Sequence, residues 1–223
     1  MNEMIIRTND LLENPTPRVP VCLVLDTSGS MSGAPVNELE SGLRSFLDAI
    51  RNDDMARHAA EISIVTFNDV AVQTMDFASI DRQQAPVLAA GGSTAMGSAV
   101  DMALNLLNKR KEAYQTSGVD YYQPWLVLMT DGQPTDSIES AVRRCQQAVN
   151  ERKLSIFAIG VGNGADMNTL ARFSPKRQPL KLQGLSFTNF FEWLSKSIAR
   201  VSASTPGESV PLDVNGLKGW AEI

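Results

Sequence analysis

The sequence predicts an α/β protein with a doubly wound, mostly parallel six-stranded sheet, flanked by helices and carrying one antiparallel edge strand. Short, continuous apolar segments at 21–25, 125–130 and 154–161 are typical of strands buried on both faces. Segments with apolar residues at helical spacing separate them, which is the pattern of a parallel sheet with crossover helices. The segments 61–67 and 70–75 are joined by a tight turn, which predicts a hairpin and hence the antiparallel strand.

The elements follow in order along the chain. Strand 21–25 runs into Asp26 and is followed by an amphipathic helix over 35–52, with a proline in its first turn. Strand 61–67 alternates and contains β-branched residues, and 70–75 returns beside it. The remaining expected elements are a small-residue loop at 89–94, a helix marked by apolar residues at 100–107, strand 125–130, a helix marked by apolar residues at 138–149, strand 154–161, helix 167–173, strand 180–182 and helix 187–201.

Length and composition predict one domain with two short flanks. A chain of 223 residues with 43% hydrophobic residues can bury one substantial core. We expect residues 1–18 to form an irregular N-terminal arm, with a short edge strand at its start, and residues 19–203 to form the domain. The C-terminal extension, 204–223, is rich in proline and glycine but carries enough apolar residues to pack back on the domain or on a partner.

Charge and hydropathy exclude several classes of function. The net charge of −5 argues against nucleic acid as a partner, because phosphate binding depends on clustered Lys and Arg. No apolar run is long enough to span a membrane, and the N-terminus has no signal-peptide core. Cys22 and Cys145 fall at apolar positions and are expected to be buried thiols in a reducing compartment. These observations favour a cytoplasmic location.

Oxygen side chains gather where strands end. Asp26, Ser28 and Ser30 follow the first strand in a tight turn, and hard oxygen ligands of this kind suit Mg²⁺, Mn²⁺ or Ca²⁺. Open α/β sheets bind ligands at the carboxyl ends of their strands, so further ligands should follow other strands. Asp131, after strand 125–130, and Thr94, in the small-residue loop, have suitable chemistry. The sequence therefore predicts a divalent-cation site, with Mg²⁺ expected from its cellular abundance.

These motifs resemble the metal-ion-dependent adhesion site (MIDAS) of the von Willebrand factor A family. The resemblance consists of DTSGS at 26–30, GGST at 91–94 and TDG at 130–132, and it covers about residues 19–202. It implies the strand order 3-2-1-4-5-6, in which the strands that end at positions 26 and 131 are neighbours.

The resemblance also implies which groups would coordinate the cation. Ser28 and Ser30 would bind the metal directly, Thr94 directly in the ligand-bound state, and Asp26 and Asp131 directly or through water. An Asp or Glu of a partner protein would take the remaining position and form a metal bridge. The expected function is thus a metal-dependent protein-binding module and not an enzyme.

The alternative is a metal-dependent hydrolase or phosphoesterase that uses the same site. A Ser-His-Asp triad needs a histidine near Ser28, but His58 lies between the first helix and the second strand, at the opposite edge of the sheet. Metal-assisted hydrolysis needs only a bound water and a base, and Asp131 could be that base. Asp136, near the same rim, is expected to cap the helix that follows it.

A narrower resemblance concerns the group of stand-alone bacterial proteins encoded in tellurium-resistance operons, the TerY group. It rests on DTSGSMSG from position 26, TDGQPTD from position 130 and GWAEI at 219–223. It implies a stress-response function and a partner such as an operon-encoded kinase or phosphatase. Self-association is a further expectation, because Glu208, Asp213 or Glu222 could offer a carboxylate to the metal of a neighbouring copy.

Overall fold

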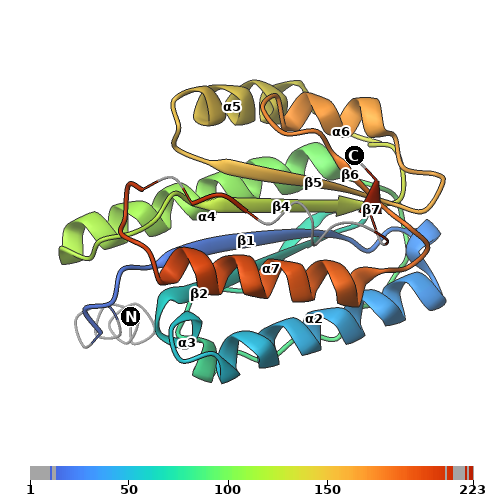
Figure 1. The fold of residues 1–223 in the computed structure, drawn as a ribbon. Coiled ribbons are helices and arrows are strands. Elements are labelled where there is room, and N and C mark those ends of the chain that lie inside the picture. Colours follow the sequence, from blue (N-terminus) through green and yellow to red (C-terminus); the bar gives the residue numbers. More distant parts are fainter. Residues whose placement is uncertain (1–10, 12–13, 209, 213–218, 220, 223) are drawn as a thin grey trace.

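A seven-stranded sheet runs through the middle of the protein, with helices on both of its faces (Figure 1). The computed structural model describes residues 11, 14–208, 210–212, 219 and 221–222. The strands are β1 (Val19–Asp26), β2 (Ala60–Phe67), β3 (Ala71–Met75), β4 (Trp125–Thr130), β5 (Ser155–Val161), β6 (Leu180–Leu182) and β7 (Ala221–Glu222). The helices are α2 (Ala34–Asn52), α3 (Ala56–Ala59), α4 (Met96–Ser117), α5 (Glu139–Asn150), α6 (Met167–Phe173) and α7 (Phe187–Ser202), with 3-10 turns η1 (Gly29–Met31) and η2 (Ile80–Arg82).

The strand order is β3-β2-β1-β4-β5-β6-β7. The order expected for the first six strands is confirmed, and so is the hairpin that makes β3 antiparallel to β2. Strand β1 pairs in parallel with both β2 and β4, and β4, β5 and β6 continue the parallel sheet. The change of direction in chain order occurs at β1, so the loops after β1 and β4 lie at the switch point of the sheet.

The seventh strand differs from the prediction of six. Ala221 and Glu222 pair antiparallel with β6, so the sheet has an antiparallel strand at each edge. The two residues belong to the proline- and glycine-rich extension, whose sequence has no strand pattern. Pairing supplies partners to the otherwise open backbone groups of β6, which is a tertiary effect.

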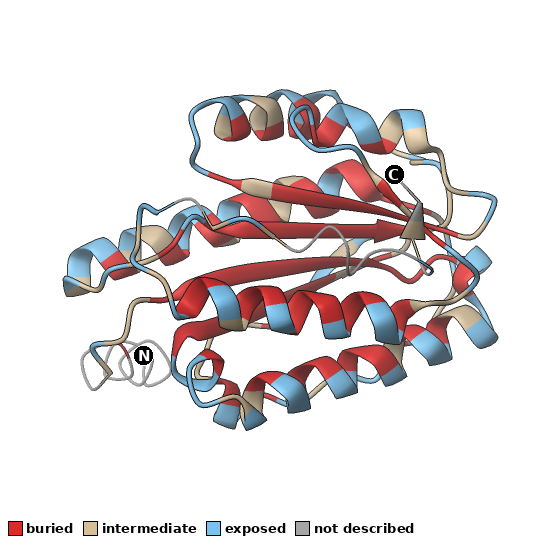
Figure 2. Cartoon of the chain, viewed as in Figure 1, coloured by how far each residue is buried: buried red, intermediate tan, exposed pale blue. Residues whose placement is uncertain are grey.

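Alternate residues of β1 face two separate hydrophobic cores. Leu23 and Leu25 belong to the core under α2 and α7, while Cys22 and Val24 belong to the core under α4 and α5. Figure 2 shows the central strands β1 and β4 buried along their whole length and the helices buried mainly on their inner sides. Both cysteines are free and buried, as predicted, and burial raises the pKa of Cys22 and of Cys145 to about 12.

The periodic apolar positions predicted where the helices lie more accurately than where they begin and end. Helix 35–52 is found as α2, which begins one residue earlier, and segments 167–173 and 180–182 coincide with α6 and β6. Helix α4 extends well beyond 100–107 at both ends. The pattern did not reveal its outer turns, because they contain small and polar residues without a continuous apolar stripe.

A buried ion cluster occupies the amino edge of the sheet. Glu61, at the start of β2, accepts hydrogen bonds from Arg18 Nε (3.2 Å) and Arg110 Nε (2.6 Å), and also from the Tyr114 hydroxyl. Arg110 lies in the middle of the basic run 109–111, but the residue is only 8% exposed. The run 109–111 is therefore part of α4, and its central residue, Arg110, points into the protein.

The two flanks differ in how much of them is described. The expected edge strand at the start of the arm lies outside the described residues, and so does Asp213. In the extension, Val210, Leu212 and Ala221 pack against the core under α2 and α7. No helix among the described residues has the length and hydropathy required to cross a membrane.

Candidate metal centre

Asp26 lies at the end of β1 and is fully buried. Its Oδ1 accepts a hydrogen bond from the Ser28 backbone N–H at 2.7 Å, and its Oδ2 accepts one from the Thr130 hydroxyl. Burial raises the pKa of the Asp26 carboxyl, the hydrogen bonds from Ser28 and Thr130 lower it, and the charge of Asp131 raises it again. The burial effect is the largest, so the protein holds a carboxylate that lacks compensating positive charge.

A chain of side-chain oxygens connects the loops after β1 and β4. The hydroxyls of Ser28 and Ser30 are 3.0 Å apart, and the Ser30 hydroxyl donates to Asp131 Oδ1 at 2.7 Å. Ser30 and Asp131 are separated by 101 positions in sequence. They meet because β1 and β4 are parallel neighbours with Leu25 opposite Met129.

Thr94 reaches the same edge through its loop. The Gly91 N–H donates to Thr27 O at 2.9 Å, and the Gly29 N–H donates to Gly92 O at 3.0 Å. Thr94 itself is 7% exposed and has no side-chain hydrogen bond to the other four residues. The structure therefore brings Asp26, Ser28, Ser30 and Asp131 into one hydrogen-bonded group and holds Thr94 beside it.

Asp69 anchors the loop that carries Thr94. Its Oδ1 accepts hydrogen bonds from both the backbone N–H and the hydroxyl of Ser93, each at 2.8 Å. Gly92 has φ +74°, and a Cβ there would lie 2.5 Å from Asp69 Oδ2, so only glycine allows this approach. In the sequence, Asp69 belongs to the tight turn between segments 61–67 and 70–75, and its position after a buried strand is the one signal of this function.

Asp136 caps a helix, but not the one that was expected. Its Oδ1 accepts from the Gly97 N–H at 2.9 Å, and its Oδ2 accepts from the Ser98 N–H and hydroxyl at 2.8 Å. These groups open α4, which begins just after Thr94, whereas the prediction placed Asp136 at the helix that follows it. Asp136 caps α4 because the loop after β4 lies across the N-terminus of that helix, where free N–H groups need acceptors.

Thr135 completes the attachment of Thr94 from the same loop. The Thr94 N–H donates to the Thr135 hydroxyl at 3.0 Å, and the Thr135 N–H donates to Thr94 O at 2.9 Å. Together with Asp69 and Asp136, it fixes the backbone on both sides of Thr94. Thr130, which bonds to Asp26, was also missed as a contributor, although it directly precedes Asp131 in the sequence.

The donor set fits a small divalent cation. Oxygens that neighbour one another around an octahedral Mg²⁺ are separated by about 2.9 Å, given metal–oxygen distances of about 2.1 Å. The spacings of 3.0 and 2.7 Å along Ser28, Ser30 and Asp131 are close to that value. Within the described part of the chain, no three His, Cys, Asp or Glu residues form a metal-holding group. The site would therefore have to use hydroxyls beside its carboxylates.

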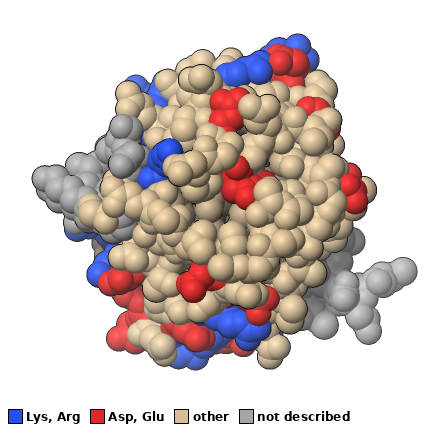
Figure 3. All heavy atoms as spheres, turned by 90° about the vertical axis from the view of Figure 1, so that its right-hand side faces the viewer, with Lys and Arg blue, Asp and Glu red and all other residues tan. Residues whose placement is uncertain are grey.

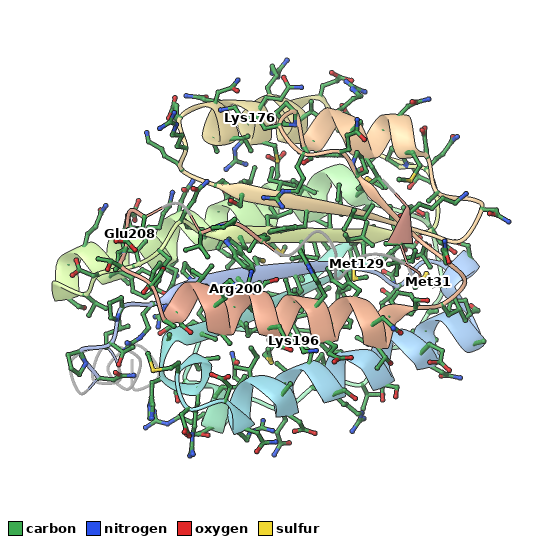
Figure 4. All side chains as sticks on the ribbon, viewed as in Figure 1. Met31, Met129, Lys176, Lys196, Arg200 and Glu208 are labelled. Carbon is green, nitrogen blue, oxygen red and sulfur yellow. The ribbon has the colours of Figure 1, made fainter. Side chains whose placement is uncertain are left out.

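The surface around this site is sparsely charged. Figure 3 views the edge at which β1 and β4 end, and it shows Asp and Glu near the middle of a mostly uncharged face. Lys and Arg lie toward the margin of that face. Met31, next to Ser30, and Met129 are buried at this same end of the sheet (Figure 4). The candidate site thus lies on buried apolar side chains and is open to solvent at Ser30.

A doubly wound sheet with oxygen ligands at its switch point defines a class of divalent-cation-binding domains. The family model for the von Willebrand factor type A domain matches residues 21–190, more than half of the chain. The chain therefore belongs to this family of metal-binding protein-interaction modules.

Two curated relatives match only part of their own length. The collagen alpha-1(XXI) chain of Homo sapiens is 27% identical over 150 residues, which cover 65% of this chain and 14% of the relative. Inter-alpha-trypsin inhibitor heavy chain H2 of Mus musculus is 25% identical over 176 residues, which cover 72% of this chain and 17% of the relative. The chain thus spans less than a fifth of the length of either relative.

Solved structures share the fold at low sequence identity. The pilus adhesin SpaC of Lactobacillus rhamnosus GG is 15% identical with a TM-score of 0.65, covering 83% of this chain and 31% of its own. Proximal thread matrix protein 1 from the mussel byssus, in a structure with a zinc-occupied MIDAS motif, is 16% identical with a TM-score of 0.57. That match covers 83% of this chain and 49% of the mussel protein.

Proposed function

We propose that the protein is a binding module in which a divalent cation bridges to an Asp or Glu of a partner protein. The proposed ligands are Asp26, Ser28, Ser30, Thr94 and Asp131. The observation that carries the proposal is the oxygen chain from Ser28 through Ser30 to Asp131, which joins two loops at the switch point. The zinc-occupied motif of the mussel structural neighbour supports a cation at this kind of site.

The balance of charges supports a bridging function. Two carboxylates and three neutral hydroxyls would leave a divalent cation with positions and charge for further oxygen ligands. An external carboxylate suits such a position, because hard cations prefer anionic oxygen. The oxygen spacings favour Mg²⁺ over the larger Ca²⁺, whose metal–oxygen distances are about 2.4 Å. Mn²⁺ has the same preference for oxygen and is the second candidate.

We also propose a subgroup of the family, a cellular process and a partner. We place the protein with the TerY-type members of the family, in a cytoplasmic stress response related to tellurium resistance. The partner in this assignment is an operon-encoded kinase or phosphatase. Its support is the motif resemblance described above, particularly TDGQPTD from position 130 and GWAEI at 219–223.

Calorimetry and partner capture test the cation site together. Wild type should bind Mg²⁺ or Mn²⁺ with one site per chain, and the variant Asp131→Ala should lose that binding. Capture of partner proteins should require the metal and should be lost in EDTA and in Asp131→Ala. Asp54→Ala is the matched control, because this exposed aspartate lies in the loop after α2, at the opposite edge of the sheet. Capture that persists undiminished in EDTA would contradict the proposal.

The enzymatic alternative needs its own measurement. His58, the single histidine of the chain, is exposed on α3 at the amino edge, so Ser28 has no imidazole base. We therefore propose a function without catalysis. Turnover of phosphoester substrates in Mg²⁺, lost in Asp131→Ala, would overturn that part of the proposal and favour a metal-dependent phosphoesterase.

Self-association remains part of the proposal as a metal-dependent contact. Glu208, on the extension, is exposed and could reach the cation of a second copy. Sedimentation in Mg²⁺ and in EDTA, with Glu208→Gln as the variant, tests this contact. A monomer under both conditions would refute it.

A further inference from the structure

A cavity of about 820 Å³ lies at the amino edge of the sheet, opposite the candidate metal centre. Its walls come from the second half of α4, the starts of β4 and β5, the end of α7 and the extension. Figure 4 shows Glu208, which lines it, at the left-hand end of the molecule, and Met31 at the right-hand end. The volume lies within the range of small-molecule sites. We call it the amino-edge cavity.

Positive charge predominates in the amino-edge cavity, although the protein as a whole is acidic. The cationic lining residues are Lys111, Arg152, Lys153 and Arg177. The carboxylates that line it are Glu112 and Glu208. Lys153 has an ion pair, at 2.7 Å to Glu151. The other three cations have no ion pair among the described residues, so their charges are available to an anion.

Two of these cations are held in unfavourable surroundings. Burial lowers the pKa of Lys111, and the nearby charge of Lys153 lowers it further. Arg177 is exposed as a whole residue, but its guanidinium carbon lies 4.3 Å from the ring centre of Phe157. Partial burial there lowers the pKa of Arg177. An anion bound in the amino-edge cavity would offset both costs.

We propose that the amino-edge cavity binds an organic phosphate, whose phosphate group contacts Arg177 and Lys111. A guanidinium offers paired N–H donors that match phosphate oxygens, and a neighbouring ammonium adds a point charge. Val201, Val210 and Leu212 form an apolar side of the cavity, against which the organic part of the ligand packs. This site is separate from the proposed cation site and does not depend on it.

Isothermal titration calorimetry in EDTA tests the proposal without the metal centre. The probes are ATP, AMP and pyrophosphate, and the variants are Lys111→Gln and Arg177→Gln. Lys196→Gln is the matched control, because Lys196 lies exposed on α7, pairs with Glu192 and does not line the cavity. We expect saturable binding of ATP or AMP, about tenfold weaker in each cavity variant and unchanged in the control.

The remaining outcomes separate the alternatives. Pyrophosphate should bind at least tenfold more weakly than ATP, because it lacks the organic part. Equal affinities would refute the proposal that the cavity binds the organic part of the ligand. Without ligand, Lys111→Gln should melt no lower than wild type, because the costs of burial and of the nearby Lys153 charge outweigh the attraction of Glu112. No saturable binding of any probe, or unchanged affinities in both variants, would overturn the site. A lower melting temperature with unchanged affinity would make these cations structural.

Discussion

Asp136 provides the sharpest test of how the loops at the carboxyl edge support one another. Its carboxylate accepts three hydrogen bonds from the first turn of α4, two from backbone N–H groups and one from the Ser98 hydroxyl. Replacing Asp136 with alanine removes these acceptors and a negative charge at a helix N-terminus. Because α4 begins just after Thr94, the change should affect both stability and metal binding.

The magnitude follows from the groups lost. Removing a capping side chain costs about 1 kcal/mol, and the interaction of a carboxylate with the helix dipole adds roughly 0.5 kcal/mol. The hydroxyl hydrogen bond adds a further amount of about the same size. Asp136→Ala should therefore lower the free energy of unfolding by ~2 kcal/mol, and the melting temperature by roughly 4–8 °C for a chain of this length. Mg²⁺ affinity should fall about tenfold, as for groups that orient ligands.

Urea denaturation and calorimetry measure the two effects separately. Asp136→Asn keeps one acceptor and should show about half of the stability loss. Glu139→Ala, an exposed change at the start of α5, should cost less than about 0.5 kcal/mol because its partner Arg172 is on the surface. If Asp136→Ala unfolds at the same urea concentration as Glu139→Ala, the capping argument is wrong.

The remaining predictions concern three other carboxylates. Glu61→Ala should destabilise the protein by about 3–5 kcal/mol in urea denaturation, because two buried guanidinium groups lose the carboxylate that balances their charge. Glu40 accepts a hydrogen bond from the Leu88 N–H at 2.7 Å, which lowers the pKa of the Glu40 carboxyl, so Glu40→Gln should lower the free energy of unfolding at pH 7. The difference from wild type should shrink as the pH falls below 4.5, because wild type then loses the same charge. A difference that does not depend on pH would contradict this prediction. Asp69→Asn should increase amide hydrogen exchange at Ser93 severalfold, and unchanged exchange would show that Asp69 does not hold the loop.

Much of the fold follows from local pattern. The apolar run at 21–25 is typical of a strand buried on both faces, and the apolar spacing in 35–52 is typical of a helix that buries one side. The helix ends were less predictable, since the outer turns of α4 carry no apolar stripe. Strand β7 had no pattern to find, because its pairing depends on the free edge of β6.

Some residues of the candidate site could likewise be predicted from local sequence, and others could not. Asp26, Ser28 and Ser30 were identifiable because a strand end and a glycine turn place three oxygens within five residues. Asp131 was identifiable because it follows a second buried strand, and Thr94 because it lies in a small-residue loop; the motif resemblance then joined them to the first three. The sequence offered no comparable signal for Asp69 or Asp136, because what each side chain contacts is decided by loops far away in the chain.

The sequence alone determined the alternation of strands and helices and the choice of oxygen ligands, because both depend on neighbouring residues. Only the tertiary structure decided which loops meet: parallel pairing of β1 with β4 sets Ser30 against Asp131 across 101 positions. The same holds for the amino-edge cavity, whose cations come from three separate segments of the chain. Such contacts depend on strand order and register, which are fixed by burial of the whole sheet and not by any local segment.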